Sequence, residues 1–249
     1  MTYEYILKTA FNQSAIDLGC RVKDLVTPGN KVVLSQQSPL ARKYLNLPFA
    51  CNLVSYGGNV VASVSEELAD LAWKYINNRE WYHCFETPDI IELSNKLADY
   101  NCRLRFMAEY FLPDPDLIAD LSCPYKMTEL DQADFAGLYK DEWSNALCEK
   151  RKELDIMGVG AYDGDKLIGL AACSADCDEM YQIGIDVLPE YRRRGVASAL
   201  TSRLAKRIIE AGKVPFYCAA WSNIASVKNA IKSGFRPAWV ELTAVRKEK

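Results

Sequence analysis

The spacing of apolar and polar residues along the first half of the chain predicts a mixture of helices and strands. Apolar residues at intervals of three and four predict helices at 14–26, 65–76 and 87–100. Alternating and β-branched runs predict strands at 31–35, at 103–111 and on both sides of the glycine pair within 49–64. This half therefore has the elements of its own α/β layer.

The second half alternates strands and helices more regularly. Its apolar runs predict strands at 125–130, on both sides of a turn within 158–175, and at 180–187, 214–220 and 235–245. Helical spacing is found at 131–143, 147–154, 195–212 and 223–234. The pattern is typical of a sheet flanked by helices.

The segment between the two halves is rich in proline and aspartate, which is typical of a linker. We therefore predict an N-terminal α/β domain of unknown role at 1–112, a linker at 113–123 and a second domain at 124–249. Three roles stay open for the N-terminal domain: a degenerate copy of the second fold, a lid over its substrate, or a dimerisation surface.

Composition narrows the classes of function. The chain of 249 residues has a formal net charge of -3, which does not support a general affinity for nucleic acid or for an anionic membrane. Its cysteines are odd in number and no signal peptide opens the sequence, so we expect a reduced, cytoplasmic protein. With His83 as the single histidine and no second cysteine pair beside Cys173 and Cys177, no metal site is expected.

Positive charge is concentrated at one turn, in the stretch VLPEYRRRGVAS at 187–198. Pro189 ends the preceding strand, and the following helix carries Val196, Leu200, Leu204 and Ile208 on one face. The first N–H groups of such a helix have no partner within it, and its dipole favours an anion there. We therefore predict a local anion site, to which three consecutive arginines add charge.

The turn resembles the signature of the GNAT superfamily of N-acetyltransferases, Arg/Gln-x-x-Gly-x-Gly/Ala. It reads Arg192-Arg193-Arg194-Gly195-Val196-Ala197 in this sequence. The second element of that family, an asparagine followed by Gly-Phe, is matched at 223–235. The resemblance covers the second half and implies a mixed, mainly antiparallel sheet flanked by helices, with a smaller α/β domain before it.

The resemblance also implies acetyl-CoA as co-substrate, with its pyrophosphate on the arginine turn. The residues expected to contact it are Val187, Arg192, Arg193, Arg194, Gly195, Val196, Ala197, Ser198, Asn223 and Ser226. Asn223 is also a good N-cap, and the two roles are compatible. The implied activity is transfer of an acetyl group to a primary amine of a small molecule or peptide.

Catalytic groups are less well marked by the pattern. Asp186 is the first candidate for the base and Glu179 the second, although either carboxylate could instead be solvated or ion-paired. Ala230 occupies the position where many relatives carry a tyrosine acid, so that role has no candidate there. Cys218 could be proposed as a nucleophile, but its apolar surroundings favour buried core.

The acceptor is expected to contact the loop that holds Trp143, Ser144 and Asn145, unless Trp143 packs beneath that loop. The expected partners are an amine acceptor and, in a homodimer, a second copy of the chain. The alternative function is a non-catalytic acyl-CoA-binding regulatory module in which the missing tyrosine reflects lost chemistry.

Overall fold

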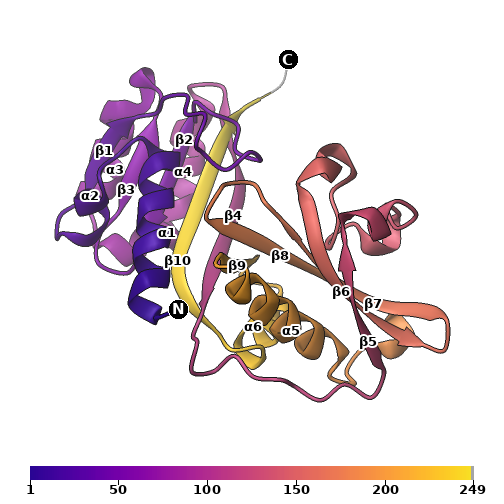
Figure 1. The fold of residues 1–249 in the computed structure, drawn as a ribbon. Coiled ribbons are helices and arrows are strands. Elements are labelled where there is room, and N and C mark those ends of the chain that lie inside the picture. Colours follow the sequence, from indigo (N-terminus) through magenta and orange to yellow (C-terminus); the bar gives the residue numbers. More distant parts are fainter. Residues whose placement is uncertain (248–249) are drawn as a thin grey trace. The chain divides into compact units, whose positions relative to one another are not determined.

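The computed structural model describes residues 1–247 and divides the chain into two compact units (Figure 1). Unit 1 consists of Met1–Thr9 and Phe111–Pro237, and unit 2 of Ala10–Tyr110 with the residues from Ala238 onward. These units differ from the predicted domains at both ends of the chain, because the first residues belong with the second half and the last ones with the first half.

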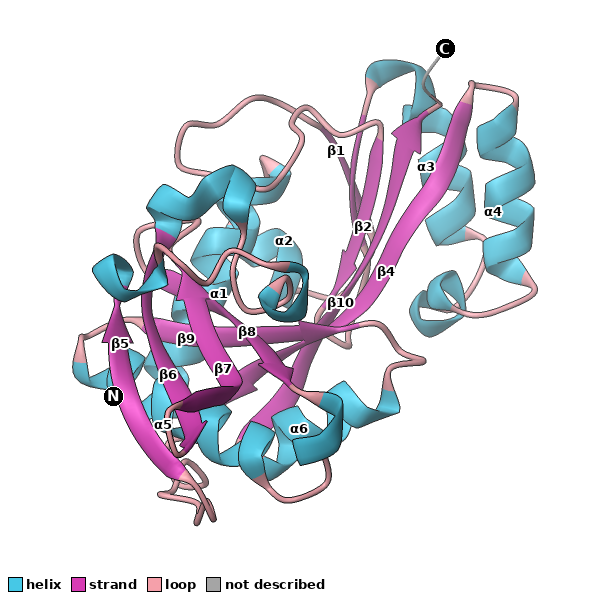
Figure 2. Cartoon of the chain, turned by 90° about the vertical axis from the view of Figure 1, so that its right-hand side faces the viewer, coloured by secondary structure: helices cyan, strands magenta, loops and turns pink. Residues whose placement is uncertain are grey.

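Unit 1 contains a mainly antiparallel sheet with the strand order β9-β8-β7-β6-β5 (Figure 2). Only the β8/β9 pair is parallel among these five strands. The strands are β5 Lys126–Asp131, β6 Asp155–Asp163, β7 Lys166–Ser174, β8 Met180–Val187 and β9 Val214–Ala219. The mixed, mainly antiparallel sheet expected for the second half is thus confirmed.

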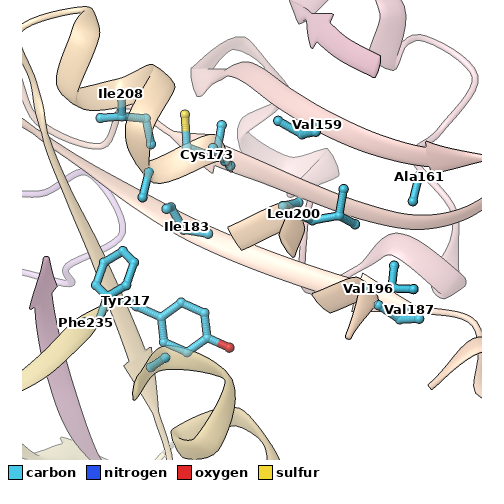
Figure 3. Packing of buried hydrophobic residues seen from close by; sticks show 14 of the residues in the cluster. Val159, Ala161, Cys173, Ile183, Val187, Val196, Leu200, Ile208, Tyr217 and Phe235 are labelled. Atoms are coloured by element: carbon cyan, nitrogen blue, oxygen red, sulfur yellow. The ribbon is translucent and has the colours of Figure 1, made fainter. Parts of the chain in front are cut away.

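Two α-helices cover one face of this sheet, α5 Val196–Glu210 and α6 Ile224–Lys232. The apolar stripe predicted for α5 is buried, since Val196 is 2% exposed and Leu200, Leu204 and Ile208 are fully covered. Figure 3 shows Val196, Leu200 and Ile208 in one cluster with Ile183 and Val187 of β8, and Leu204 belongs to the same cluster. The burial of this stripe supplies most of the contact between α5 and the sheet.

The opposite face is covered by short 3₁₀ turns, η3 Gln132–Phe135, η4 Asp141–Trp143 and η5 Glu149–Leu154. The helices predicted at 131–143 and 147–154 are therefore wrong. Arg151 interrupts the last turn with a non-helical φ of -140° and ψ of 38°. Between η4 and η5 the chain is held to the sheet by side chains of other strands, so tertiary contacts override helix propensity here.

The predicted linker at 113–123 lies on unit 1. The Asp114 N–H donates to the carbonyl of Gly234 at 2.9 Å. Ser202 of α5 donates to the carbonyl of Ala119 at 2.6 Å, and Lys206 pairs with Asp120 at 2.8 Å. These bonds fix the segment along α5.

Unit 2 joins the C-terminal strand to a sheet from the first half, with the order β1-β3-β2-β10-β4. Strands β2 and β3 form the hairpin predicted around the glycine pair, and β10 pairs antiparallel with β2. The strands are β1 Lys31–Leu34, β2 Cys51–Ser55, β3 Val61–Val64, β4 Cys102–Pro113 and β10 Phe235–Arg246. The first half therefore has α/β content, as predicted.

The α-helices not yet named are α1 Tyr3–Leu18, α2 Val22–Val26, α3 Ala69–Asn77 and α4 Asp89–Ala98. The remaining 3₁₀ turns are η1 Glu66–Leu68 and η2 Trp81–Phe85 and, within unit 1, η6 Pro189–Tyr191. The single helix predicted at 14–26 is wrong, because Gly19 at a φ of +70° ends α1 before α2 begins. No helix within residues 1–247 is long and apolar enough to span a membrane.

Candidate functional site

Strands β8 and β9 separate after three paired residues. Met180, Tyr181 and Gln182 pair with residues 214–216, and the register ends there. From Ile183 to Val187, β8 pairs with β7 on one side only. The β9-facing edge of this half of β8 thus has main-chain groups that no strand satisfies, which is where an extended ligand can add its own hydrogen bonds.

The arginine turn follows directly at the end of this open edge. Arg193 has a φ of +63° and Gly195, the N-cap of α5, a φ of +83°. A left-handed conformation is unfavourable for a residue with a Cβ, and such strain is concentrated at functional sites. The alternating turn aims successive N–H groups in one direction, which makes an anion-binding concavity.

The main chain of the turn is suited to an anion. The first bond of α5 runs from the Ala199 N–H to the Gly195 carbonyl at 3.1 Å, so the amides of Val196, Ala197 and Ser198 precede it. A Cβ on Gly195 would meet nothing within 4 Å, so the space beside this residue is open. This arrangement suits a phosphate-type anion.

The three arginines differ in their contacts. The Arg192 Nε donates to the carbonyl of Val187 at 2.9 Å and thereby closes the strand end. The Arg194 guanidinium donates to the hydroxyl of Tyr125 at 2.6 Å and lies over the ring of Tyr191. Arg193 is exposed, and its side chain makes no hydrogen bond or ion pair within residues 1–247. Arg193 is therefore the arginine most available to an anion.

The second motif adjoins the first through contacts between α5 and α6. Ser233 donates to the carbonyl of Ser198 at 3.2 Å, and Asn229 donates to the hydroxyl of Thr201 at 3.0 Å. Asn223 caps α6, accepting from the Ser226 N–H at 3.1 Å. These contacts join the last turn of α6 to the first turns of α5, while Asn223 and Ser226 lie at the opposite end of α6.

The predicted carboxylates lie at opposite ends of β8. Asp186, at the open end, accepts hydrogen bonds from the main-chain N–H and side-chain amide of Asn145 and from the N–H of Ala146. Glu179 precedes the paired end and forms an ion pair with Lys213 at 3.0 Å. The structure therefore places Asp186, but not Glu179, beside the open edge.

The predicted acceptor loop divides into buried and exposed parts. Trp143 is 2% exposed and packs in the core under the loop, so its ring does not face an acceptor from solvent. Ser144 and Asn145 are exposed and lie next to each other on the same face of the sheet as Asp186. The alternative role of Trp143, packing beneath the loop, is the one observed.

The structure adds one side-chain contact at the point where β8 and β9 separate. Gln182 donates from its side chain to the sulfur of Cys218 at 3.2 Å. Cys218 is half-buried, so the prediction of buried core at this residue is wrong, although its neighbours Phe216 and Tyr217 are buried. Strand alternation places Gln182 on the face of Asp186, a signal available from sequence.

The residues of this site offer no constellation for a metal. Within residues 1–247, no group of three or more histidine, cysteine, aspartate or glutamate side chains is arranged to hold an ion. The site is instead built from main-chain amides, three exposed arginines and an open strand edge, and such donors bind anions and extended chains.

The model of the GNAT acetyltransferase family matches residues 75–238, which is more than half of the chain. The chain belongs to this family. The arginine turn, the separated strands β8 and β9 and helix α6 all lie within the matched residues. Family membership supports acyl transfer as the general chemistry.

Among solved structures, the chain is similar to an N-acetyltransferase-like protein from Streptococcus suis, with 20% identity over 64% of this chain and 69% of that one at a TM-score of 0.46. An acetyltransferase of the GNAT family from Colwellia psychrerythraea is 17% identical over 60% of each chain, with a TM-score of 0.46. A Drosophila protein is 12% identical over 99% of this chain and 91% of its own, with a TM-score of 0.48. No curated protein matches the sequence significantly.

Proposed function

We propose that this protein is an acetyl-CoA-dependent N-acyltransferase that transfers an acetyl group to a primary amine of a small molecule or peptide. The observation that carries the proposal is the continuity between the open edge of β8 and the anion-binding turn at the start of α5. A CoA thioester has both parts that such a surface selects, a pyrophosphate and an extended amide-containing arm.

In this proposal the amides of Val196, Ala197 and Ser198 and the side chain of Arg193 hold the pyrophosphate. The unpaired edge of β8 near Val187 receives the extended arm through main-chain hydrogen bonds. When bound, acetyl-CoA supplies the activated acyl group as a thioester. In this proposal the side chains of Asn223 and Ser226, at the start of α6, also contact the cofactor.

The amine acceptor is proposed to approach from the face of the sheet that carries Ser144 and Asn145. These side chains are exposed, and Asn145 lies beside the open half of β8 through its bonds to Asp186. The opposite face is filled by α5 and by the core around Leu200. An acceptor on the loop face would therefore reach an acyl group at the open edge without crossing the core.

Calorimetric titration with acetyl-CoA tests the cofactor site. Ala197 is half-buried at the start of α5, so Ala197→Glu places a negative charge among the free amides without the backbone strain that a side chain on Gly195 would bring. Ala197→Gln is the matched control, because it adds nearly the same volume without charge. We expect the wild type to bind, and Ala197→Glu to bind at least about tenfold more weakly than Ala197→Gln.

A folded wild type that binds no acetyl-CoA would contradict the proposal. Binding without release of free thiol in the presence of primary amines would instead favour a non-catalytic acyl-CoA-binding module. A specific observation favours that second function: Ala230 is fully buried at the position of the family's tyrosine acid, so no phenol is available there. Turnover measured as thiol release distinguishes the two.

A further inference from the structure

Both oxygens of the Asp186 carboxylate accept hydrogen bonds from the acceptor loop. Its Oδ2 accepts from the main-chain N–H groups of Asn145 at 2.9 Å and Ala146 at 3.0 Å. Its Oδ1 accepts from the side-chain amide of Asn145 at 2.7 Å. Three donors on one ionised carboxylate are charge-assisted hydrogen bonds, the stronger class in proteins.

Strand β8 has a glycine, Gly184, where the main chain of the acceptor loop packs against it. A Cβ on Gly184 would lie 1.9 Å from the carbonyl oxygen of Asn145 and 3.0 Å from the Cα of Ala146. Both neighbours are backbone atoms, so no side-chain rotation could make room. Glycine is required here by the close approach of the loop main chain to β8.

A second carboxylate holds the other end of the same loop. Asp155 of β6 accepts from the N–H of Cys148 at 2.8 Å. Between the two anchors, the Leu147 N–H donates to the carbonyl of Trp143 at 2.9 Å. All four amides from 145 to 148 are thus satisfied, and the loop is held against the sheet by β6 and β8.

Engagement of both oxygens with the loop competes with the role of a general base. A base must accept a proton on an oxygen that faces the substrate, and both oxygens of Asp186 already accept hydrogen bonds from the loop. The same bonds are well suited to fixing the position of the loop next to the open edge.

We propose that Asp186 is a positioning residue that holds Asn145 and Ala146 against Gly184 as a fixed wall of the amine-acceptor site. This inference rests on the proposed N-acyltransferase function and replaces the expectation that Asp186 is the base. The wall presents the exposed side chains of Ser144 and Asn145 beside the half of β8 that no longer pairs with β9. Its loss raises KM for the amine and leaves acetyl-CoA binding intact.

Amide hydrogen exchange tests the wall directly in the full chain. Asp186→Asn keeps the shape of the side chain but replaces one acceptor oxygen with a donor, and Gly184→Ala displaces the loop while leaving the carboxylate in place. We expect protection of the Asn145 and Ala146 amides to fall at least about tenfold in both variants. Gly137→Ala is the matched control, because its Cβ would meet nothing within 4 Å and protection should not change.

Kinetics with benzylamine and with the peptide Ala-Ala-Ala separate positioning from base catalysis. Both variants should raise KM for the amine about tenfold with kcat within about threefold, and the acetyl-CoA Kd should stay within about twofold. A loss of kcat of about 100-fold in Asp186→Asn, with KM and exchange unchanged and Gly184→Ala normal, would overturn the inference in favour of a base.

The exchange measurement keeps this inference separate from the proposed function. Native protection in Asp186→Asn overturns the wall whether or not the enzyme turns over. A wild type that binds no acetyl-CoA contradicts the proposed function, while exchange still reports on the contact. If Gly184→Ala does not fold, Asn145→Ala removes one bond to Asp186 and should give a smaller loss of protection at Ala146.

Discussion

The hydroxyls of Tyr217 and Ser226 lie 2.7 Å apart and join the half of β9 that has separated from β8 to the first turn of α6. Tyr217 is 3% exposed, and burial raises the pKa of its phenol. Ser226 has its amide capped by Asn223, so one residue connects the strand and the helix cap. The relative position of β9 and α6, on which the second motif depends, is held by this pair.

We predict that removing either hydroxyl destabilises the protein. Ser226→Ala leaves the phenol of Tyr217 without this partner in a buried position and should lower the free energy of unfolding by about 1–2 kcal/mol. Tyr217→Phe should have a smaller effect, because it removes the polar group itself. Chemical denaturation measures the loss of unfolding free energy in both single variants and in the double variant. The loss in the double variant should be well below the sum of the two single losses. Strict additivity would contradict a direct bond.

Gly195 provides a test of the strained turn. A Cβ there would meet no atom within 4 Å, yet the φ of +83° is unfavourable for any residue with a side chain. Gly195→Ala should therefore lower the free energy of unfolding by about 1 kcal/mol or more through backbone strain alone. Gly137→Ala has equal space without a positive φ and is the control. Equal stability of the two variants would show that the turn is not held left-handed.

A third prediction concerns the buried arginine of unit 2. Arg42 pairs with Asp17 and, at 2.8 Å, with Glu241 of β10, and all three side chains are 3% exposed or less. The Trp239 indole also donates to Glu241 at 2.9 Å. Arg42 therefore ties the C-terminal strand to helix α1.

Arg42→Met should lower the free energy of unfolding by about 3–5 kcal/mol, because it leaves two carboxylates buried without their cation. The loss should change little between low and high salt, since buried pairs are poorly screened. Denaturant unfolding at two ionic strengths measures both effects. The exposed pair of Lys74 and Asp70 is the control, where Lys74→Met should change stability by less than about 1 kcal/mol. A salt-sensitive loss at Arg42 would mean that the site is hydrated.

Much of unit 1 could be predicted because its signals are local. The apolar stripe of α5, the strand at 180–187 and the Gly164 turn each depend on a few neighbouring residues, and the structure has all three. The arginine turn could also be predicted from neighbouring residues, but the different contacts of Arg192 and Arg194 could not. Their partners Val187 and Tyr125 can be assigned only when the strands are in place.

The acceptor side could not be predicted in the same way. Asp186 is separated from Asn145 by 41 positions in the sequence. The alternation of side chains along the strand predicts the sheet face on which Asp186 lies, but it does not predict the three hydrogen-bond donors that its carboxylate meets there. The same distant contact suppressed the helices expected around the loop. The C-terminal strand was assigned to the second domain, although residues 240–244 pair with β2 of the first half. Long-range pairing leaves no local pattern that distinguishes these alternatives.

The last prediction concerns Asp155, the other anchor of the acceptor loop. Asp155 is 1% exposed, and burial raises the pKa of its carboxyl to about 6 despite the hydrogen bond from Cys148. In the unfolded chain an aspartate has a pKa of about 3.9. Between these values the folded state binds the proton more tightly than the unfolded state does. The contribution of Asp155 to stability should therefore increase as the pH falls from about 7 to about 4.

Asp155→Asn removes this titration. The difference in free energy of unfolding between the wild type and the variant should shift in favour of the wild type by up to about 3 kcal/mol on going from pH 7 to pH 4. Denaturant unfolding at several pH values measures this difference, which cancels the titration of the other carboxylates. Asp165→Asn, at an exposed turn, is the control and should show a flat difference. A flat difference for Asp155→Asn as well would mean that water reaches Asp155 and that its carboxylate holds Cys148 at no electrostatic penalty.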